Sequence, residues 1–243
     1  MADQEGEQGA GMITELGLRV PKDSLEYWKK RLEDEEIEYE TEDWHGRETL
    51  SFEDPHGLPL RIVPEDTEDY TPWEASEVPE ENQIRGMHHV TVELRDTGTL
   101  GEVMKRLGME ETQDYGGRYF EMEDGSGIEL RETEKSGRMG TGTVHHFAFK
   151  AADSEEELES MREKLQSIGL RPSPAINRKY FTSTYCRMPG GVLFEFSTMG
   201  PGYTADESVE ELGTNFVLPE KLQDRRQEIL EALPEFREEE LYR

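Results

Sequence analysis

Histidine and glutamate residues at the beginning of strand-like segments, or inside them, are the first candidates for chemistry in this chain. Four of the six histidines form two adjacent pairs, His88–His89 in GMHHVTVEL and His145–His146 in TVHHFAFKA. Each pair opens a segment in which apolar and polar residues alternate, as they do in a β-strand. Glu195 lies in VLFEF, an otherwise apolar segment where a buried carboxylate needs a partner. Imidazole nitrogen and carboxylate oxygen are donors to non-haem metal ions.

An internal repeat supplies the elements that must position these residues. Residues 12–64, 86–132 and 142–198 each show the order strand, helix, then further strands. In the third copy Ser154 is suited to cap the helix, and Gly169 is suited to end it. The segment DPHGLPLRIV of the first copy aligns with MPGGVLFEFS of the third without a gap. The sequence therefore predicts an α+β chain of three repeated βαβββ modules, followed by a C-terminal helical tail.

These modules divide the chain into five predicted parts. The helix of the tail is expected to begin after Pro219. The parts are a flexible lead-in (1–11), a single module forming half a domain (12–66), a linker (67–85), a two-module domain with the metal site (86–200) and the tail (201–243).

Composition narrows the possible partners and compartment. Asp and Glu number 56 against 27 Lys and Arg, a formal net charge of −29. Such a surface repels nucleic acids and anionic membranes, and it is typical of proteins that stay soluble in high salt, which suggests a halophilic source. The one cysteine, Cys186, rules out an internal disulfide framework. No apolar run is long enough to cross a membrane, so a cytoplasmic protein is expected.

Overlaying the modules shows which histidines are equivalent. His89 in the second module and His146 in the third occupy the same place in the first strand, and Glu15 occupies that place in the first module. In the last strand the third module has Glu195 and the first has Arg61.

The second module has Arg131 at the last-strand place, if one residue of slack is allowed. An arginine cannot ligate a metal ion. The chain is therefore predicted to build one metal site, from His89, His146 and Glu195. Two imidazoles and one carboxylate leave open positions on an Fe(II) ion for a substrate and O₂.

A longer motif links this pattern to a known family. The stretch NRKYFTSTYCRMPGGVLFEFSTMGPGY, residues 177–203, resembles the signature of the glyoxalase-type ring-cleaving dioxygenases, which belong to the vicinal oxygen chelate superfamily. The resemblance extends over nearly all of residues 12–236. It implies the vicinal oxygen chelate fold and extradiol-type cleavage of a small hydroquinone- or catechol-like aromatic by O₂. The implied cofactor is Fe(II) first, with Mn(II) or another divalent metal as alternatives.

The resemblance also implies roles for three further residues. Tyr185 matches a tyrosine that donates a hydrogen bond to the substrate, and Arg178 matches an arginine that could hold an ionised ring hydroxyl. His145 matches a histidine that could act as an acid–base group. Because successive strand residues face opposite sides, His145 would need a bulge, or a route around the edge of the sheet, to reach the substrate.

The chain departs from the family in its number of modules. The family normally has four, and the first of them is expected to be missing here. In the family the partners of His146 and Glu195 include a histidine from that first module. On this alternative the chain supplies only two ligands, and His89 is not a ligand.

Other functions remain compatible with the same fold. A glyoxalase-like isomerase or lyase is one, and a non-catalytic protein that binds small molecules or metal is another. An odd number of modules leaves one half-sheet without a partner in the chain. A homodimer or higher homo-oligomer, with modules paired between chains, is therefore expected.

Overall fold

The computed structural model describes residues 4–67, 70–112, 118–122 and 124–233, and it confirms the three βαβββ modules. Each module has one helix between its first strand and the three strands that follow. The first comprises β1 (Met12–Val20), α1 (Leu25–Asp34), β2 (Tyr39–Trp44), β3 (Arg47–Glu53) and β4 (Pro59–Pro64). The second comprises β5 (Gly86–Leu94), α2 (Gly98–Leu107), β6 (Glu110–Thr112), β7 (Arg118–Glu121) and β8 (Gly127–Glu132). The third comprises β9 (Phe147–Ala152), α3 (Glu155–Ser167), β10 (Ile176–Asn177), β11 (Thr182–Arg187) and β12 (Leu193–Thr198).

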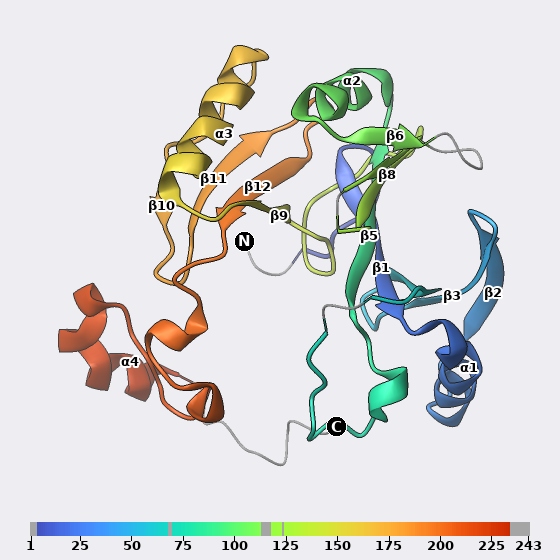
Figure 1. Ribbon diagram of the computed structural model, residues 1–243, viewed down its shortest axis with the longest axis horizontal. Helices are drawn as coiled ribbons and strands as arrows, with labels where there is room; N and C mark the ends of the chain where they lie inside the picture. The colour runs from blue at the N-terminus through green and yellow to red at the C-terminus, as the bar shows by residue number, and fades with distance from the viewer. Residues whose placement is uncertain (1–3, 68–69, 113–117, 123, 234–243) are drawn as a thin grey trace.

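The strands form two sheets of unequal size (Figure 1). The first and second modules share an eight-stranded sheet in the order β2-β3-β4-β1-β5-β8-β7-β6, and the third has a four-stranded sheet in the order β10-β11-β12-β9. Strands β1 and β5, the first of their modules, pair antiparallel at the centre of the larger sheet. Within every module the first and last strands pair in parallel. The smaller sheet therefore repeats half of the larger one, with β9 at its edge.

The pairing of modules differs from the predicted two-module domain over residues 86–200. Strand β5 joins the first module through β1, and the third module keeps a sheet of its own. The second and third modules nevertheless supply most of one hydrophobic core, in which Leu100 of α2 and Leu158 of α3 are fully buried and to which Ile13 of β1 also belongs. The Lys164 ammonium of α3 also donates a hydrogen bond to the Leu107 carbonyl at the end of α2, at 2.9 Å. The second module thus shares its sheet with the first module and most of its main hydrophobic core with the third.

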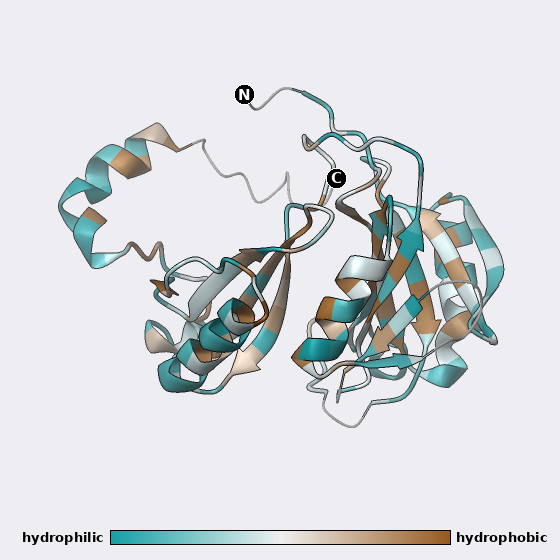
Figure 2. Cartoon of the chain, turned by 90° about the horizontal axis from the view of Figure 1, so that it is seen from above, coloured by the Kyte–Doolittle hydropathy of each residue, from teal (hydrophilic) through white to brown (hydrophobic). Residues whose placement is uncertain are grey.

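Local sequence signals account for the helix of the third module. The Ser154 hydroxyl accepts a hydrogen bond from the Glu157 amide, as an N-cap does, and Gly169 follows the helix with a φ of +89°. Leu158 and Leu165 form its buried face. Figure 2 shows the result across the molecule, with hydrophobic residues along the strands and mixed hydropathy around the helices, as expected of helices with one buried face.

The segments outside the modules have definite contacts. The lead-in that the sequence predicts to be flexible runs beside the segment that precedes β9. Two backbone hydrogen bonds join them: the Gly6 amide donates to the Thr141 carbonyl at 2.9 Å, and the Glu7 amide donates to the Arg138 carbonyl at 2.8 Å. The helix predicted after Pro219 is present and starts as a 3₁₀ turn. The remaining elements are the 3₁₀ turns η1 (Lys22–Ser24), η2 (Glu80–Asn82), η3 (Tyr203–Ala205), η4 (Val209–Glu211) and η5 (Glu220–Arg225), and the helix α4 (Arg226–Ala232).

Candidate active site

The third module brings together the histidine and glutamate predicted as ligands. His146 immediately precedes β9 and Glu195 lies in β12, the neighbouring strand. Their nearest atoms, His146 Nε2 and Glu195 Oε2, are 2.8 Å apart. The Glu195 side chain is only 4% exposed and its other oxygen accepts a hydrogen bond from the Ser197 hydroxyl, whereas the His146 side chain is 35% exposed. The pair thus combines a buried, satisfied carboxylate with an imidazole that solvent can reach.

Two of the residues given substrate roles lie beside this pair. Tyr185 of β11 is directly opposite Glu195 in the sheet register, so both side chains are on the same face. The ring of Tyr185 meets the ring of His146 edge to face, with centroids 5.7 Å apart. The Arg178 guanidinium donates a hydrogen bond to the Tyr185 hydroxyl at 3.1 Å. Arginine, tyrosine, histidine and glutamate therefore form one continuous set of contacts.

His145 is the fifth predicted residue at this location. Its Nδ1 atom is 2.9 Å from Nδ1 of His146, and the two rings are perpendicular. Both histidines precede β9, which begins at Phe147. Strand alternation therefore does not force them to opposite faces, and His145 contacts His146 without a bulge in the strand. The His145 side chain is exposed.

His89 lies elsewhere, in the centre of the eight-stranded sheet. Its Nε2 atom is 3.2 Å from Glu15 Oε1, and its ring stacks on Trp44 with centroids 4.2 Å apart. The structure therefore does not bring His89 to His146 and Glu195, and the predicted set of three ligands is divided between two sheets. The overlay placed His89 and His146 in equivalent positions, but equivalence does not decide which modules face each other. That is decided by the pairing of β5 with β1.

The register of the strands also corrects the overlay of the last strands. The residue two places after His89 pairs with Glu129, and the residue two places after His146 pairs with Glu195. Glu129, and not Arg131, is thus the second-module equivalent of Glu195. The prediction that only one module carries both a histidine and a glutamate is wrong, because the second carries them as well.

A glycine in the turn before each last strand is the sequence signal that could have found Glu129. Gly57, Gly125 and Gly191 all have positive φ angles in the turn before the last strand of their modules. The residue four places after each glycine is Arg61, Glu129 and Glu195, respectively. Aligning the turn glycines, which adopt this conformation more readily than other residues, gives the correct register without slack.

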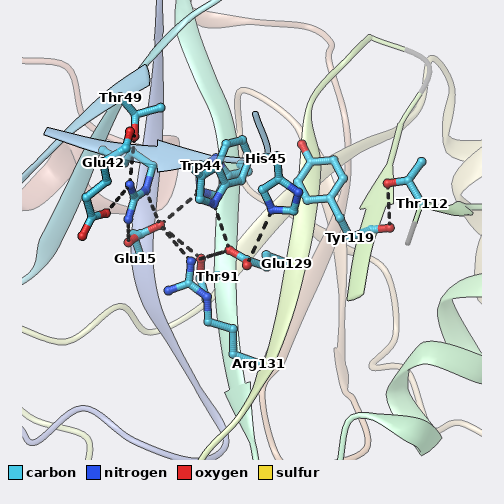
Figure 3. A network of polar contacts seen from close by, with 12 residues as sticks. Glu15, Glu42, Trp44, His45, Thr49, Thr91, Thr112, Tyr119, Glu129 and Arg131 are labelled. Atoms are coloured by element: carbon cyan, nitrogen blue, oxygen red, sulfur yellow. Dashed lines mark hydrogen bonds and ion pairs between the residues drawn. The ribbon is translucent and has the colours of Figure 1, made fainter. Parts of the chain in front are cut away.

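The centre of the larger sheet is a dense network of charges (Figure 3). The Arg61 guanidinium donates to both oxygens of Glu15, each at 3.0 Å, so that this pair is bidentate and buried. Arg131 donates to Glu129 Oε2 at 2.7 Å. The Thr91 hydroxyl lies between the two carboxylates, within hydrogen-bonding distance of both. Both carboxylates are therefore neutralised by arginines.

Burial and hydrogen bonding set the protonation states at this centre. Burial opposes the charged form of Glu15, but hydrogen bonds from His89 and Arg61 outweigh it and hold the pKa of the Glu15 carboxyl well below its usual range. Burial lowers the pKa of His89 to about 4, although the hydrogen bond to Glu15 acts in the opposite direction. At neutral pH this centre thus holds a carboxylate and a neutral imidazole.

Comparison with known proteins identifies the family. Residues 86–196 match the model of the Glyoxalase/Bleomycin resistance protein/Dioxygenase superfamily. The chain is 32% identical to a protein of Bacillus subtilis (strain 168) named as the ring-cleaving dioxygenase MhqO, over 98% of this chain and 78% of that protein. The chain belongs to this family. It is also 31% identical to chlorohydroquinone/hydroquinone 1,2-dioxygenase of Sphingobium indicum, over 96% of this chain and 76% of that enzyme.

A solved structure of a related protein has the same fold as this chain. The crystal structure of a Bacillus subtilis protein described as a dioxygenase matches with a TM-score of 0.90 and 30% identity, over 97% of this chain and 77% of that one. The predicted vicinal oxygen chelate fold is thereby confirmed. No helix within the described ranges of this family member is both long and apolar enough to cross a membrane.

Two groups of side chains in this dioxygenase-family chain offer atoms that suit a metal ion. His146 and Glu195 form the open pair. Glu15, His89 and Glu129 have ligand atoms within 4.8 Å of one another, and within residues 4–67, 70–112, 118–122 and 124–233 they are the one such group of three or more. Arginines already bind both carboxylates of the buried group. The open pair therefore fits a metal ion that must also accept a substrate, and the buried group does not.

Proposed function

We propose that this chain is a metal-dependent, extradiol-type ring-cleaving dioxygenase whose chemistry takes place at His146 and Glu195. The contact set of Arg178, Tyr185, His146 and Glu195 carries the proposal, because it joins a metal-type donor pair to a phenol and a guanidinium on an accessible face. The family supports the reaction class, since its members similar to this chain are named ring-cleaving dioxygenases.

The substrate is proposed to be a hydroquinone- or catechol-like aromatic. The relative from Sphingobium indicum is named for hydroquinone and chlorohydroquinone. An ionised ring hydroxyl, or phenolate, is an anion. The permanently charged Arg178 guanidinium lies beside the Tyr185 hydroxyl and can pair with such an anion. Arg178 would orient the ionised hydroxyl, and Tyr185 would donate a hydrogen bond to an oxygen where negative charge develops. A substrate can reach Arg178 and Tyr185 for these two roles because both side chains lie on a face that is open to solvent.

The cofactor is proposed to be Fe(II), with Mn(II) as the alternative. Imidazole and carboxylate suit either ion, which when bound would hold the aromatic and O₂ side by side. His146 Nε2 and Glu195 Oε2 would be two of its ligands. His145 lies at hydrogen-bonding distance from His146 Nδ1, where it can orient the ring and take up or release a proton.

The third ligand is proposed to come from pairing between chains. In the part of the chain that the structure describes, β9 makes strand pairs only with β12, so its outer edge is free. The first strands of the other two modules, β1 and β5, pair with each other. This pairing brings Glu15 and His89, the residues equivalent to His146, to one centre. A second copy that docked its β9 in the same way would add its own His146 and Glu195. A homodimer in light scattering supports this arrangement, and a monomer with full activity would contradict it.

Oxygen uptake by the Fe(II)-loaded protein tests the proposed reaction. Hydroquinone and catechol are offered under air, and ring opening is followed by the absorbance of the product. The variants His146→Ala and Glu195→Gln should lose uptake, and His56→Ala, which changes an exposed histidine in a turn, should retain it. No uptake by the unmodified protein with Fe(II) or Mn(II), together with tight binding of the aromatic, would instead favour a non-catalytic binding protein.

A further inference from the structure

The centre of the eight-stranded sheet has the same four strand places from which a two-module metal site would be built. The first strands contribute Glu15 and His89, and the last strands contribute Arg61 and Glu129. Three of these side chains have ligand atoms within 4.8 Å of one another and are buried. The fourth is a cation. The arrangement is therefore a set of metal-ligand places with one position occupied by a positive charge.

Arg61 is held at this centre by four hydrogen bonds. Besides the two bonds to Glu15, its Nη1 atom donates to Glu42 Oε2 at 2.7 Å and to the Thr49 hydroxyl at 3.0 Å. Its side chain is only 5% exposed. A guanidinium has five N–H donors and no acceptor, so it neutralises a carboxylate but cannot ligate a metal ion. With both oxygens of Glu15 engaged, a metal ion could bind there only by displacing Arg61.

Arg131 is a weaker barrier than Arg61. It contacts the same centre, with Nη2 2.7 Å from Glu129 Oε2 and 3.8 Å from Glu15 Oε1. Its side chain is 36% exposed, and it lies two residues from Glu129 on β8. It can therefore turn toward solvent and leave the Glu129 carboxylate without an arginine, with Trp44 and Thr91 as its remaining hydrogen-bond donors, whereas Arg61 has no such route from its buried position.

We propose that the centre of the eight-stranded sheet is a divalent-cation site that Arg61 keeps closed. The guanidinium supplies the positive charge that a metal ion would supply, and it is covalently attached to β4. Removing that charge leaves Glu15 buried beside His89 and Glu129, and a divalent transition-metal ion then becomes the best available counter-charge. The inference is independent of the chemistry proposed at His146.

Cobalt(II) binding tests this proposal in the full chain. All variants carry His146→Ala and Glu195→Gln, so that the open pair cannot contribute. With Arg61 intact, we expect no visible cobalt absorption and no thermal shift from cobalt. Adding Arg61→Gln should lower the midpoint of thermal unfolding by roughly 10 °C, and one equivalent of Co(II) should restore most of that loss.

Two control variants tie the result to this centre. Arg61→Lys retains a positive charge and should bind no cobalt. Arg61→Gln combined with Glu129→Gln loses one ligand and should bind cobalt at least about tenfold more weakly, because one charged donor is gone. If the Arg61→Gln chain does not fold, Arg61→His replaces it, since an imidazole can both contact Glu15 and act as a fourth ligand.

Two results would overturn the proposal. One is stoichiometric cobalt binding by the chain with Arg61 intact that disappears on Glu129→Gln, because the site would then already be open. The other is a folded Arg61→Gln or Arg61→His chain, verified by circular dichroism, that binds no cobalt.

Discussion

The two histidine–glutamate pairs of this chain occupy equivalent strand places but differ in their surroundings. His89 is fully buried, stacked on Trp44, and lies between carboxylates that arginines neutralise. His146 is partly exposed and faces Glu195 with no arginine on that carboxylate among the contacts of the described chain. Equivalent strand places therefore do not give the two pairs equivalent surroundings. What distinguishes the pairs is an open face and an uncompensated carboxylate.

The largest expected effect is the loss of activity when the open pair is broken. His146→Ala removes one of the two proposed ligands in each chain and should reduce kcat/KM for hydroquinone cleavage by at least about 1,000-fold, because a bound metal ion lowers such a barrier by several kcal/mol. His89→Asn should retain kcat/KM within about threefold. Oxygen uptake measures both variants. Equal losses in the two variants would show that the two sheets act as one site.

The second effect concerns stability rather than activity. Arg61→Ala leaves Glu15 as an unpaired buried charge and should lower the free energy of unfolding by about 3–5 kcal/mol. Arg131→Ala, at a half-exposed position, should lower it by about 1 kcal/mol. Urea unfolding followed by tryptophan fluorescence measures both. A smaller loss for Arg61 than for Arg131 would contradict the description of the buried centre as locked by Arg61.

The third effect is a pH dependence of stability that arises from His89 in the buried group. His89 takes up a proton near pH 6.5 in the unfolded chain but only near pH 4 in the folded one. The unfolded state therefore binds more protons in this window, and the free energy of unfolding falls as the pH falls from 6.5 to 4, by up to about 3 kcal/mol. The free energy of unfolding, measured with urea between pH 7 and pH 5, should depend less steeply on pH in His89→Gln than in the unmodified protein. If the variant and the unmodified protein had the same pH dependence of the free energy of unfolding, titratable groups other than His89 would be responsible for it.

The smallest effect expected is at the substrate side of the open pair. Tyr185→Phe removes a hydroxyl that contacts Arg178 and should reduce kcat by about 10–100-fold, the range of a hydrogen bond to a charged group. Tyr180→Phe is the matched control, because that ring packs against Tyr203. It should leave kcat within about twofold. A comparable loss in both would mean that the site tolerates no change in this segment, and Tyr185 would have no special role.

The sequence predicted local structure well because each module is defined by short-range patterns. Strand alternation, the cap at Ser154 and the glycine at Gly169 act within a few residues, and such signals predict all three modules. The cluster of His145, His146, Tyr185 and Glu195 also followed, since these residues belong to one module and a single motif.

The arrangement of modules could not be predicted in the same way. Whether β5 pairs with β1 or with β9 depends on contacts between segments far apart in the chain, and each of these strands carries the same alternating pattern. The error that put Arg131 in place of Glu129, two residues away, had a different cause. Matching the strands by residue type allowed slack, whereas the turn glycines fix the register without it.

Metal content is the most direct test of which pair carries the chemistry. The protein and two double variants, His146→Ala with Glu195→Gln and His89→Asn with Glu129→Gln, are loaded anaerobically with Fe(II), and bound iron is measured after gel filtration. Loss of iron in the first variant and retention in the second is the predicted result. Retention in the first and loss in the second would place the metal in the eight-stranded sheet and contradict the account.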